Sequence, residues 1–415
     1  MKLFFSYGHD NHSEVVHRLA EKIKELDDNM DIWIDTDKIP RDSHWRNEIT
    51  KGIIESRSVI AFLSAYSARE ESVCRDELSI AISSKYGMIK TILLEPAGSF
   101  TPPSLLTEYQ WGDMSNYPDY IDQGEDVFDK YLEEEAQKII QLINSDEIQE
   151  YDREIRKLRE LLGLPETDVL TRFDELLGNE LIGRTWLLEK IKAWVEDPHG
   201  SQIMMLYGKP GAGKSMFAAH LQMYEPHITA AFPCDCRSSE FSNTDSIIRN
   251  ISYRLALRMP DYRSVLLNIL KKRPNYSDEN MLFNLLIATP LAKYNIDGDR
   301  GIQIIIIDAL DEMKNDHLAK FIDQYAPMMK HYMRFLITSR KIPEITERFS
   351  SCSNIDIDTY IEAGKADLKD YYEKRLGEAL SKYPEKDAFI QKLIDASDLM
   401  FAYAKCVCDN ILADI

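Results

Sequence analysis

The stretch QIMMLYGKPGAGKSMFAAHLQ, residues 202–222, decides the fold of the second half of the chain. Its centre matches the pattern G-x-x-x-x-G-K-[ST], with an apolar strand before it and a helical pattern after it. Glycines let backbone N–H groups converge on phosphate oxygens, and the following helix directs its positive end toward the same point. The stretch therefore predicts a nucleotide-phosphate site formed by Gly208, Gly211, Gly213, Lys214 and Ser215.

Within this loop we expect Lys214 to reach the β- and γ-phosphates and the Ser215 hydroxyl to ligate Mg²⁺. The partner segment is IIIIDALDE, residues 304–312, a buried strand that ends in acids. Acids at the carboxyl end of such a strand face the phosphates. We expect Asp308 to hold Mg²⁺ directly or through water, and Asp311 or Glu312 to orient or activate the attacking water.

A third apolar strand, RFLITSR at residues 334–340, ends in a cation. We expect Arg340 to sense the γ-phosphate through its guanidinium, as Thr338 and Ser339 could through their hydroxyls.

The first 120 residues alternate short apolar runs with amphipathic helical stretches. Residues 2–7, 31–35, 58–64 and 88–94 read as buried parallel strands, and residues 13–26, 43–55 and 72–85 as helices. This alternation predicts an α/β, flavodoxin-like domain with a parallel sheet and a ligand site beyond the carboxyl ends of its strands. Residues 126–162 read as a last domain helix followed by a helical connector.

A second α/β block is expected from about residue 181 to residue 340, with strands at 203–207, 302–307 and 335–338. Helices at 367–376 and 387–412 should follow it as a small helical domain. The chain thus divides into residues 1–145, a helical linker at 146–175, an α/β domain at 176–345 and a helical lid at 346–415.

The composition of the chain argues against nucleic-acid binding, a structural metal site and a membrane span. A net charge of −20 over 415 residues argues against a general nucleic-acid-binding surface. The six cysteines include two C-x-C pairs but no C-x-x-C spacing, so no structural metal is expected and the thiols read as ordinary buried residues. His9, His12, His17 and His44 are expected to face solvent or to cap. No apolar run is long enough for a membrane span, and a reducing cytoplasm fits best.

Several segments of the second half resemble the NACHT branch of the STAND NTPases. Residues 308–312, DALDE, look like that family's D-[GA]-x-D-E motif, and RFLITSR resembles its sensor strand. Residues 181–184, LIGR, resemble its lead-in segment, which places Arg184 near the base and ribose. The resemblance covers about residues 176–412. It implies ATP or ADP with Mg²⁺, slow hydrolysis, and oligomerisation driven by nucleotide exchange. It also implies a C-terminal sensor for an unknown trigger, which is absent here, so we expect a fragment of something longer.

The first half resembles a TIR domain over about residues 1–145. Residues 4–7, FFSY, with Asp10, look like its opening strand and loop, and residues 32–44 like its second strand and BB loop. Residues 72–78, SVCRDEL, resemble its S-W-C-x-x-E-L signature. Two departures are Val73, where many members have tryptophan, and Asp42, where many have the BB-loop glycine.

The TIR resemblance implies an NAD⁺-cleaving site in which Glu77 is catalytic. A carboxylate beside the ribose can stabilise the positive charge that develops as the nicotinamide bond breaks. Phe5, Ser6, Asp10 and Trp45 are candidate NAD contacts. The alternatives are that Glu77 is a surface acid and that Phe5 and Trp45 belong to the core.

Three functions follow. The first is a nucleotide-switched defence protein whose self-associated TIR domains hydrolyse NAD⁺. The second is a TIR scaffold that recruits other TIR domains without catalysis. The third is a plain ATPase with fast turnover.

Overall fold

The structure of the chain is a computed structural model. It describes residues 1–34, 45–69, 73–74, 77–78, 80–81, 88–96, 98–100, 111–164, 181–225, 228–237, 243–272, 274–276, 278–293, 302–329, 333–381 and 383–413. These residues form two compact units. The first comprises Met1–Glu166 and Leu255–Lys271, and the second comprises Thr167–Arg254 and Lys272–Ile415. The finer division into a linker and a lid stays a prediction.

The first unit contains a five-stranded sheet in the order β2-β1-β3-β4-β5, and every pairing is parallel. Its strands are β1 (Lys2–Ser6), β2 (Asp31–Trp33), β3 (Ser58–Leu63), β4 (Ile89–Leu93) and β5 (Trp111–Asp113). This order is that of a flavodoxin-like fold, as the sequence predicts. β5 was not predicted, because three residues around a glycine give no periodic signal.

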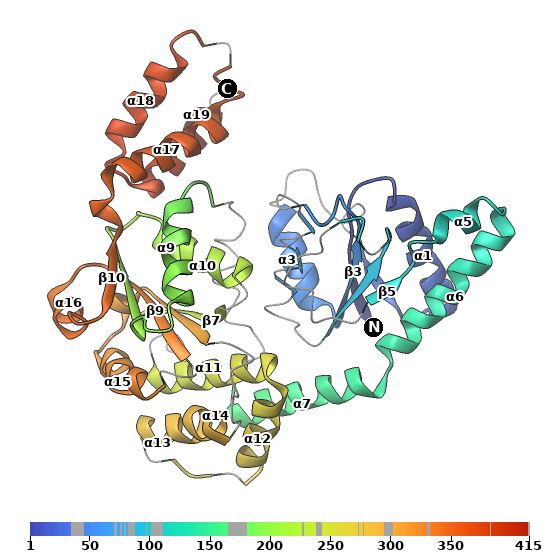
Figure 1. Cartoon of the computed structure of the whole chain (residues 1–415), viewed down its shortest axis with the longest axis horizontal. Helices are drawn as coiled ribbons and strands as arrows, with labels where there is room; N and C mark the ends of the chain where they lie inside the picture. The colour runs from blue at the N-terminus through green and yellow to red at the C-terminus, as the bar shows by residue number, and fades with distance from the viewer. Residues whose placement is uncertain are drawn as a thin grey trace. The chain divides into compact units, whose positions relative to one another are not determined.

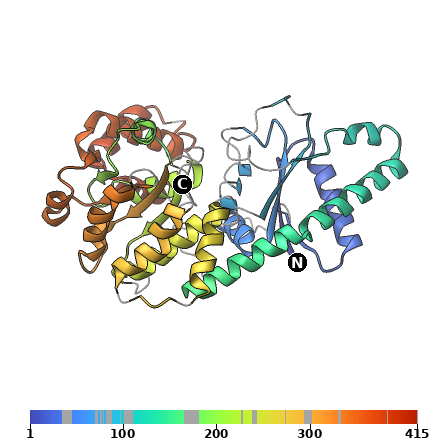
Figure 2. The same ribbon diagram turned by 60° about the horizontal axis from the view of Figure 1, so that its bottom comes forward.

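Helices cover both faces of this sheet (Figures 1 and 2). α1 (Ser13–Leu26) and α6 (Glu125–Ile143) lie together on one side, and α3 (Trp45–Glu55) lies on the other. Successive side chains of β1 point to opposite faces of the sheet, and so pack against different helices. Leu3, Phe5 and Tyr7 join the core under α1 and α6, whereas Phe4 stacks on Trp33 with ring centroids 4.7 Å apart.

The helical stretch at 126–162 is two helices. α6 ends at Ile143 and α7 (Asp146–Leu162) begins after Asn144 and Ser145. Within the first unit α7 contacts α12 (Pro260–Leu270), a helix about 100 residues farther along the chain. Glu154 of α7 accepts a hydrogen bond of 2.8 Å from Arg263, whose guanidinium also lies over the Tyr151 ring.

The second unit is built on another all-parallel sheet, in the order β10-β6-β9-β8-β7. Its strands are β6 (Ile203–Tyr207), β7 (Ile228–Pro233), β8 (Gln303–Asp308), β9 (Met333–Ser339) and β10 (Ser353–Asp356). β6, β9 and β8 are adjacent, so the three apolar segments found in the sequence form the centre of one sheet. Because these strands are parallel, residues 208, 309 and 340, which follow them, lie at the same end of the sheet.

Helices α9 (Thr185–Glu196) and α10 (Lys214–Tyr224) pack on this sheet through a shared apolar core. Further helices join β7 to β8, among them α11 (Thr244–Arg258), α13 (Glu279–Phe283) and α14 (Thr289–Lys293). α15 (His317–Tyr325) and α16 (Pro343–Arg348) flank β9. No helix in the described part of the chain has the length and apolar character needed to cross a membrane.

A separate helical bundle follows β10, shown in red in Figure 1. It contains α17 (Ile361–Leu376), α18 (Lys386–Ala396) and α19 (Phe401–Ala413), so the predicted helix at 387–412 is interrupted at residues 397–400. The bundle has its own core, which includes Leu368, Tyr372, Ile390, Ala404 and Cys408.

His220 on α10 makes the stability of the second unit depend on pH. Burial, with a smaller contribution from Lys192, lowers its pKa from 6.5 to about 4. The unfolded chain therefore takes up a proton near pH 6.5, whereas the folded chain resists it until about pH 4. We expect the free energy of unfolding to fall by up to about 3 kcal/mol between these values. In His220→Gln, the free energy of unfolding measured in urea should depend less on pH between these values. The same pH dependence as in wild type would contradict His220 as its source.

Candidate functional sites

The loop between β6 and α10 has the geometry of an anion site. Gly213, the residue before α10, has a φ of +87°, a left-handed conformation that favours glycine. Lys214 folds back over the loop, and its Nζ donates to the carbonyl oxygens of Gly208 and Lys209 at 2.6 and 3.0 Å. Burial lowers the pKa of Lys214, and nearby acids oppose that shift. A phosphate could take the place of these carbonyl acceptors.

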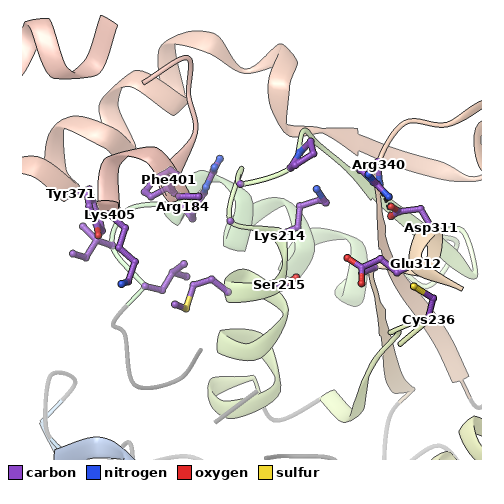
Figure 3. A pocket seen from close by; sticks show the side chains of 18 of the residues that line it. Arg184, Lys214, Ser215, Cys236, Asp311, Glu312, Arg340, Tyr371, Phe401 and Lys405 are labelled. Atoms are coloured by element: carbon purple, nitrogen blue, oxygen red, sulfur yellow. Dashed lines mark hydrogen bonds and ion pairs between the residues drawn. The ribbon is translucent and has the colours of Figure 1, made fainter. Parts of the chain in front are cut away.

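A cavity of about 710 Å³ opens over this loop (Figure 3). Its volume lies in the range of small-molecule sites. Of the predicted nucleotide residues, it is lined by Gly211, Gly213, Lys214, Ser215, Arg184, Asp311, Glu312 and Arg340. Asp308 and Gly208 are not among the lining residues.

Asp308 lies behind the cavity wall, 4% exposed. Its Oδ1 accepts a hydrogen bond of 2.5 Å from Thr338, and the Thr338 hydroxyl also accepts one of 2.8 Å from the backbone N–H of Ala309. Thr338 thus ties the end of β9 to the acidic turn after β8. The side chains of Thr338 and Ser339 are both buried and donate hydrogen bonds within the protein, and the expectation that they sense phosphate stays a prediction.

Asp311 and Arg340 form an ion pair at the cavity wall. The Arg340 guanidinium contacts Oδ2 of Asp311, and the Arg340 backbone N–H donates to Oδ1 at 2.8 Å. Burial alone would raise the pKa of Asp311, but the hydrogen bonds and charge of Arg340 outweigh it and lower that pKa. Asp311 is therefore paired with Arg340 in this state, and the expectation that Asp311 or Glu312 activates a water stays a prediction.

The oxygen donors around Ser215 suit Mg²⁺, which prefers hard oxygen ligands and usually binds through one or two carboxylates together with substrate phosphates. Ser215 and Glu312 line the cavity, and Asp308 lies one layer behind. Among the described residues no three His, Cys, Asp or Glu side chains form a ready metal cluster. Ser215 and these carboxylates would thus hold the ion jointly with a bound nucleotide.

Arg184 is held by hydrogen bonds to residues that are distant from it in the sequence. Its backbone N–H donates to Oδ1 of Asp367 at 2.8 Å, and its Nη2 donates to the Ala212 carbonyl at 2.7 Å. Nη1 makes no hydrogen bond among the described residues and lies 3.5 Å from Asp367 Oδ2. Gly183 beside it has a φ of +76°, and a Cβ there would come within 3.0 Å of the Asp367 backbone. Asp367 therefore fixes the lead-in segment against the helical bundle.

Asp367→Asn should destabilise the second unit. The substitution leaves the charge of Arg184, which is 3% exposed, without its partner. We expect a loss of about 3 kcal/mol in the free energy of unfolding, measured by urea denaturation. Asp370→Asn, on the exposed side of the same helix, is the matched control. Equal stability of the two variants would show that the buried pair contributes little.

The segment after β10 and the helical bundle both hold the phosphate loop, and no sequence motif predicted these contacts. The Lys209 backbone N–H donates at 2.8 Å to Asp358, which lies between β10 and α17, and the Lys209 Nζ pairs at 2.9 Å with Asp398 of the bundle. The Ala402 N–H donates to the Gly211 carbonyl at 3.1 Å. Asp398 and Leu399, which position this turn, both have a positive φ, a costly conformation for residues other than glycine.

In the first unit Ser6 and Glu77 meet at the carboxyl end of β1. Ser6 Oγ donates to Glu77 Oε2 at 2.6 Å, and the two residues are 1% and 3% exposed. The alternative that Glu77 is a surface acid is thereby wrong. Cys74 Sγ lies 2.9 Å from the Tyr7 carbonyl and holds the adjoining segment to the same strand, while Val73 is 39% exposed.

The other three residues predicted to contact NAD⁺, Phe5, Asp10 and Trp45, have different surroundings from Ser6 and Glu77. Phe5 is 1% exposed and packs on Phe62, so it is a core residue, the alternative that the sequence left open; its contact with NAD⁺ stays a prediction. Asp10 accepts hydrogen bonds from Ser64 Oγ and the His12 N–H at 2.7 and 2.9 Å, which fixes the loop after β1. Trp45 begins α3, but its side chain lies outside the described residues, as do Asp42 and the predicted BB loop.

His12 was expected to face solvent or to cap. It stands at the N-cap position of α1, but its side chain makes no capping hydrogen bond and does not face solvent. It is 7% exposed, with its ring nitrogens 2.8 Å from Tyr117 Oη and 3.1 Å from Glu95 Oε1. Glu95 follows β4 and Asp10 follows β1. These polar groups therefore gather at the same edge of the sheet as Ser6 and Glu77.

Comparison with known families agrees with this geometry. Residues 3–129 match a family described as TIR domain, and residues 184–340 match one described as Nephrocystin 3, N-terminal, a NACHT-like NTPase region. A comparison with curated proteins gave no match. A TIR domain joined to an NTPase-like region suggests a role in signalling or defence. The chain therefore combines a TIR domain with a NACHT-like NTPase region, the TIR-NACHT architecture.

Proposed function

We propose that this chain is a nucleotide-switched signalling or defence protein whose TIR domain hydrolyses the nicotinamide–ribose bond of NAD⁺. The observation that carries the proposal is the buried pair of Ser6 and Glu77 at the carboxyl end of β1. Ligands of parallel α/β sheets bind at that end. A carboxylate held at that end can stabilise a ribose that becomes positively charged as the nicotinamide bond breaks.

The role proposed for Ser6 follows from the same contact. Its hydroxyl donates to Glu77 at 2.6 Å and so orients the carboxylate. Because Glu77 is only 3% exposed, we propose that the site opens and is completed when TIR domains of several copies associate. This makes self-association the step that activates cleavage.

The NTPase region supplies the proposed switch. Lys214, Ser215, Glu312 and Arg340 line one cavity, and the helical bundle contacts the loop that would hold the phosphates through Asp398 and Ala402. A triphosphate, ATP by family resemblance, would compete with Asp311 for Arg340 and with the loop carbonyls for Lys214. Nucleotide binding would in this way change the contacts that hold the bundle and favour assembly.

A non-catalytic scaffold is the second candidate. Val73, where the TIR signature commonly has tryptophan, is exposed and departs from the family pattern. In that case the TIR domain would only recruit other TIR domains.

A measurement of nicotinamide release distinguishes the NAD⁺-hydrolysing enzyme from the non-catalytic scaffold. The purified chain is incubated at high concentration with NAD⁺, with and without Mg²⁺ and ATP, and free nicotinamide is followed by chromatography. The proposal predicts release that rises with nucleotide. A parallel sample fused to a dimerising tag forces association; absence of release in that sample as well would favour the scaffold.

A further inference from the structure

We infer that Lys209 relays nucleotide binding from the phosphate loop to the helical bundle, so that an occupied loop releases the bundle. The inference rests on the proposed nucleotide switch and names the residue through which that switch acts. It is drawn from Lys209 itself, because its N–H, its carbonyl oxygen and its Nζ are each held by a different part of the second unit.

Lys209 connects the lysine that would bind phosphate to the bundle. Its carbonyl oxygen accepts a hydrogen bond of 3.0 Å from Lys214 Nζ. Its backbone N–H donates to Asp358 at 2.8 Å, and its own Nζ pairs at 2.9 Å with Asp398, in the turn between α18 and α19. A change at the Lys209 carbonyl therefore acts on a residue whose side chain reaches the bundle.

Phosphate binding would change the hydrogen bond at that carbonyl. In this state Lys214 donates to the carbonyl oxygens of Gly208 and Lys209. A nucleotide phosphate is a charged acceptor, and an ammonium group binds it more strongly than it binds a neutral carbonyl. Lys214 would then leave the Lys209 carbonyl, and the peptide unit that carries this carbonyl would turn. The Lys209 side chain would turn with it, away from Asp398.

The ion pair between Lys209 and Asp398 is weak enough to break in this way. The two side chains are 50% and 69% exposed. Exposed ion pairs contribute little to stability, because water competes for both charges and the long side chains lose entropy when they pair. A small change in the loop is therefore sufficient to separate Lys209 from Asp398.

The turn of the bundle that faces the loop is strained. Asp398 and Leu399 have left-handed backbone conformations, with φ of +46° and +61°, which cost free energy in residues other than glycine. Contacts with the loop and with α17 hold the turn: the Ala402 N–H donates to the Gly211 carbonyl at 3.1 Å, and a Cβ at Gly364 would lie 3.2 Å from Leu399. Loss of the loop contacts would let the strain relax, which favours release of the bundle.

The test is hydrogen exchange of the peptide that covers residues 397–404, measured by mass spectrometry in the full chain with and without a non-hydrolysable ATP analogue and Mg²⁺. In wild type we expect nucleotide to speed this exchange. Lys209→Met should speed it by up to about fivefold without nucleotide, the range for an exposed ion pair, and nucleotide should then add little. Lys209→Arg keeps the cation and should respond like wild type.

Asp398→Asn removes the same ion pair from the side of the bundle and should give the same result as Lys209→Met. Asparagine tolerates the left-handed conformation, so the turn should keep its shape. Because residue 398 lies outside the phosphate loop, this variant tests the relay even where Lys209→Met disturbs the loop. Lys392→Met and Asp387→Asn, at exposed positions of α18, are the matched controls and should respond like wild type.

Nucleotide binding is measured in the same samples with a fluorescent ATP analogue. Binding by wild type without faster exchange, or a wild-type nucleotide response in Asp398→Asn, would overturn the inference and leave the nucleotide site standing. Absence of binding by wild type would instead overturn the switch itself, and the inference with it.

Discussion

Replacing Glu77 by glutamine is expected to lower nicotinamide release at least about 100-fold. Glutamine preserves the shape of the side chain and can still accept the hydrogen bond from Ser6, so the fold should survive. What disappears is the negative charge that stabilises the ribose as the glycosidic bond breaks. The measurement is the initial rate of nicotinamide release at saturating NAD⁺, with unfolding in urea as a check on stability.

Glu21→Gln, on the exposed side of α1, is the control for that experiment and should match wild type. Ser6→Ala should show a smaller loss than Glu77→Gln, because Ser6 positions the carboxylate and carries no charge. Undiminished release by Glu77→Gln would remove Glu77 from the chemistry and leave the buried pair with a structural role.

Lys214→Ala is expected to weaken nucleotide binding about 100-fold. The lysine lies over the phosphate loop, and its partly buried position makes each charge-assisted hydrogen bond stronger than in water. Because the hydrogen bonds of Lys214 within the described part of the chain go to loop carbonyls, its loss should affect the bound state more than the empty one.

Fluorescent-nucleotide titration measures that effect, with Lys320→Ala, an exposed lysine of α15, as control. A loss of affinity confined to triphosphates with little change for diphosphates would show that Lys214 contacts the γ-phosphate alone. Wild-type affinity for both would contradict the assignment of the loop as a phosphate site.

Local sequence determined much of this structure. β6 spans the predicted residues 203–207, and α1 spans the predicted 13–26, because periodicity, apolar runs and the glycines around them act within a few residues. Phe5 could have been assigned from the same signal. It alternates with Leu3 and Tyr7 along β1, and all three face the helices of one layer.

Contacts distant in sequence could not be predicted. Thr338 holds Asp308 across 30 residues, and Asp367 holds Arg184 across 183. His12 lies between Glu95 and Tyr117 only because the loops after parallel strands converge. No motif marked Tyr371 or Lys405 as cavity residues, since they occur on ordinary amphipathic helices and reach the cavity through packing of the bundle.

The measurement that tests the central claim most directly is nicotinamide release by the full chain, with and without Mg²⁺ and nucleotide, in wild type, Glu77→Gln and Lys214→Ala side by side. The account predicts nucleotide-stimulated release by wild type, release at least about 100-fold slower by Glu77→Gln under every condition, and loss of the stimulation in Lys214→Ala. Release that is equally stimulated in Lys214→Ala, or that is undiminished in Glu77→Gln, would contradict a TIR enzyme controlled by this nucleotide site.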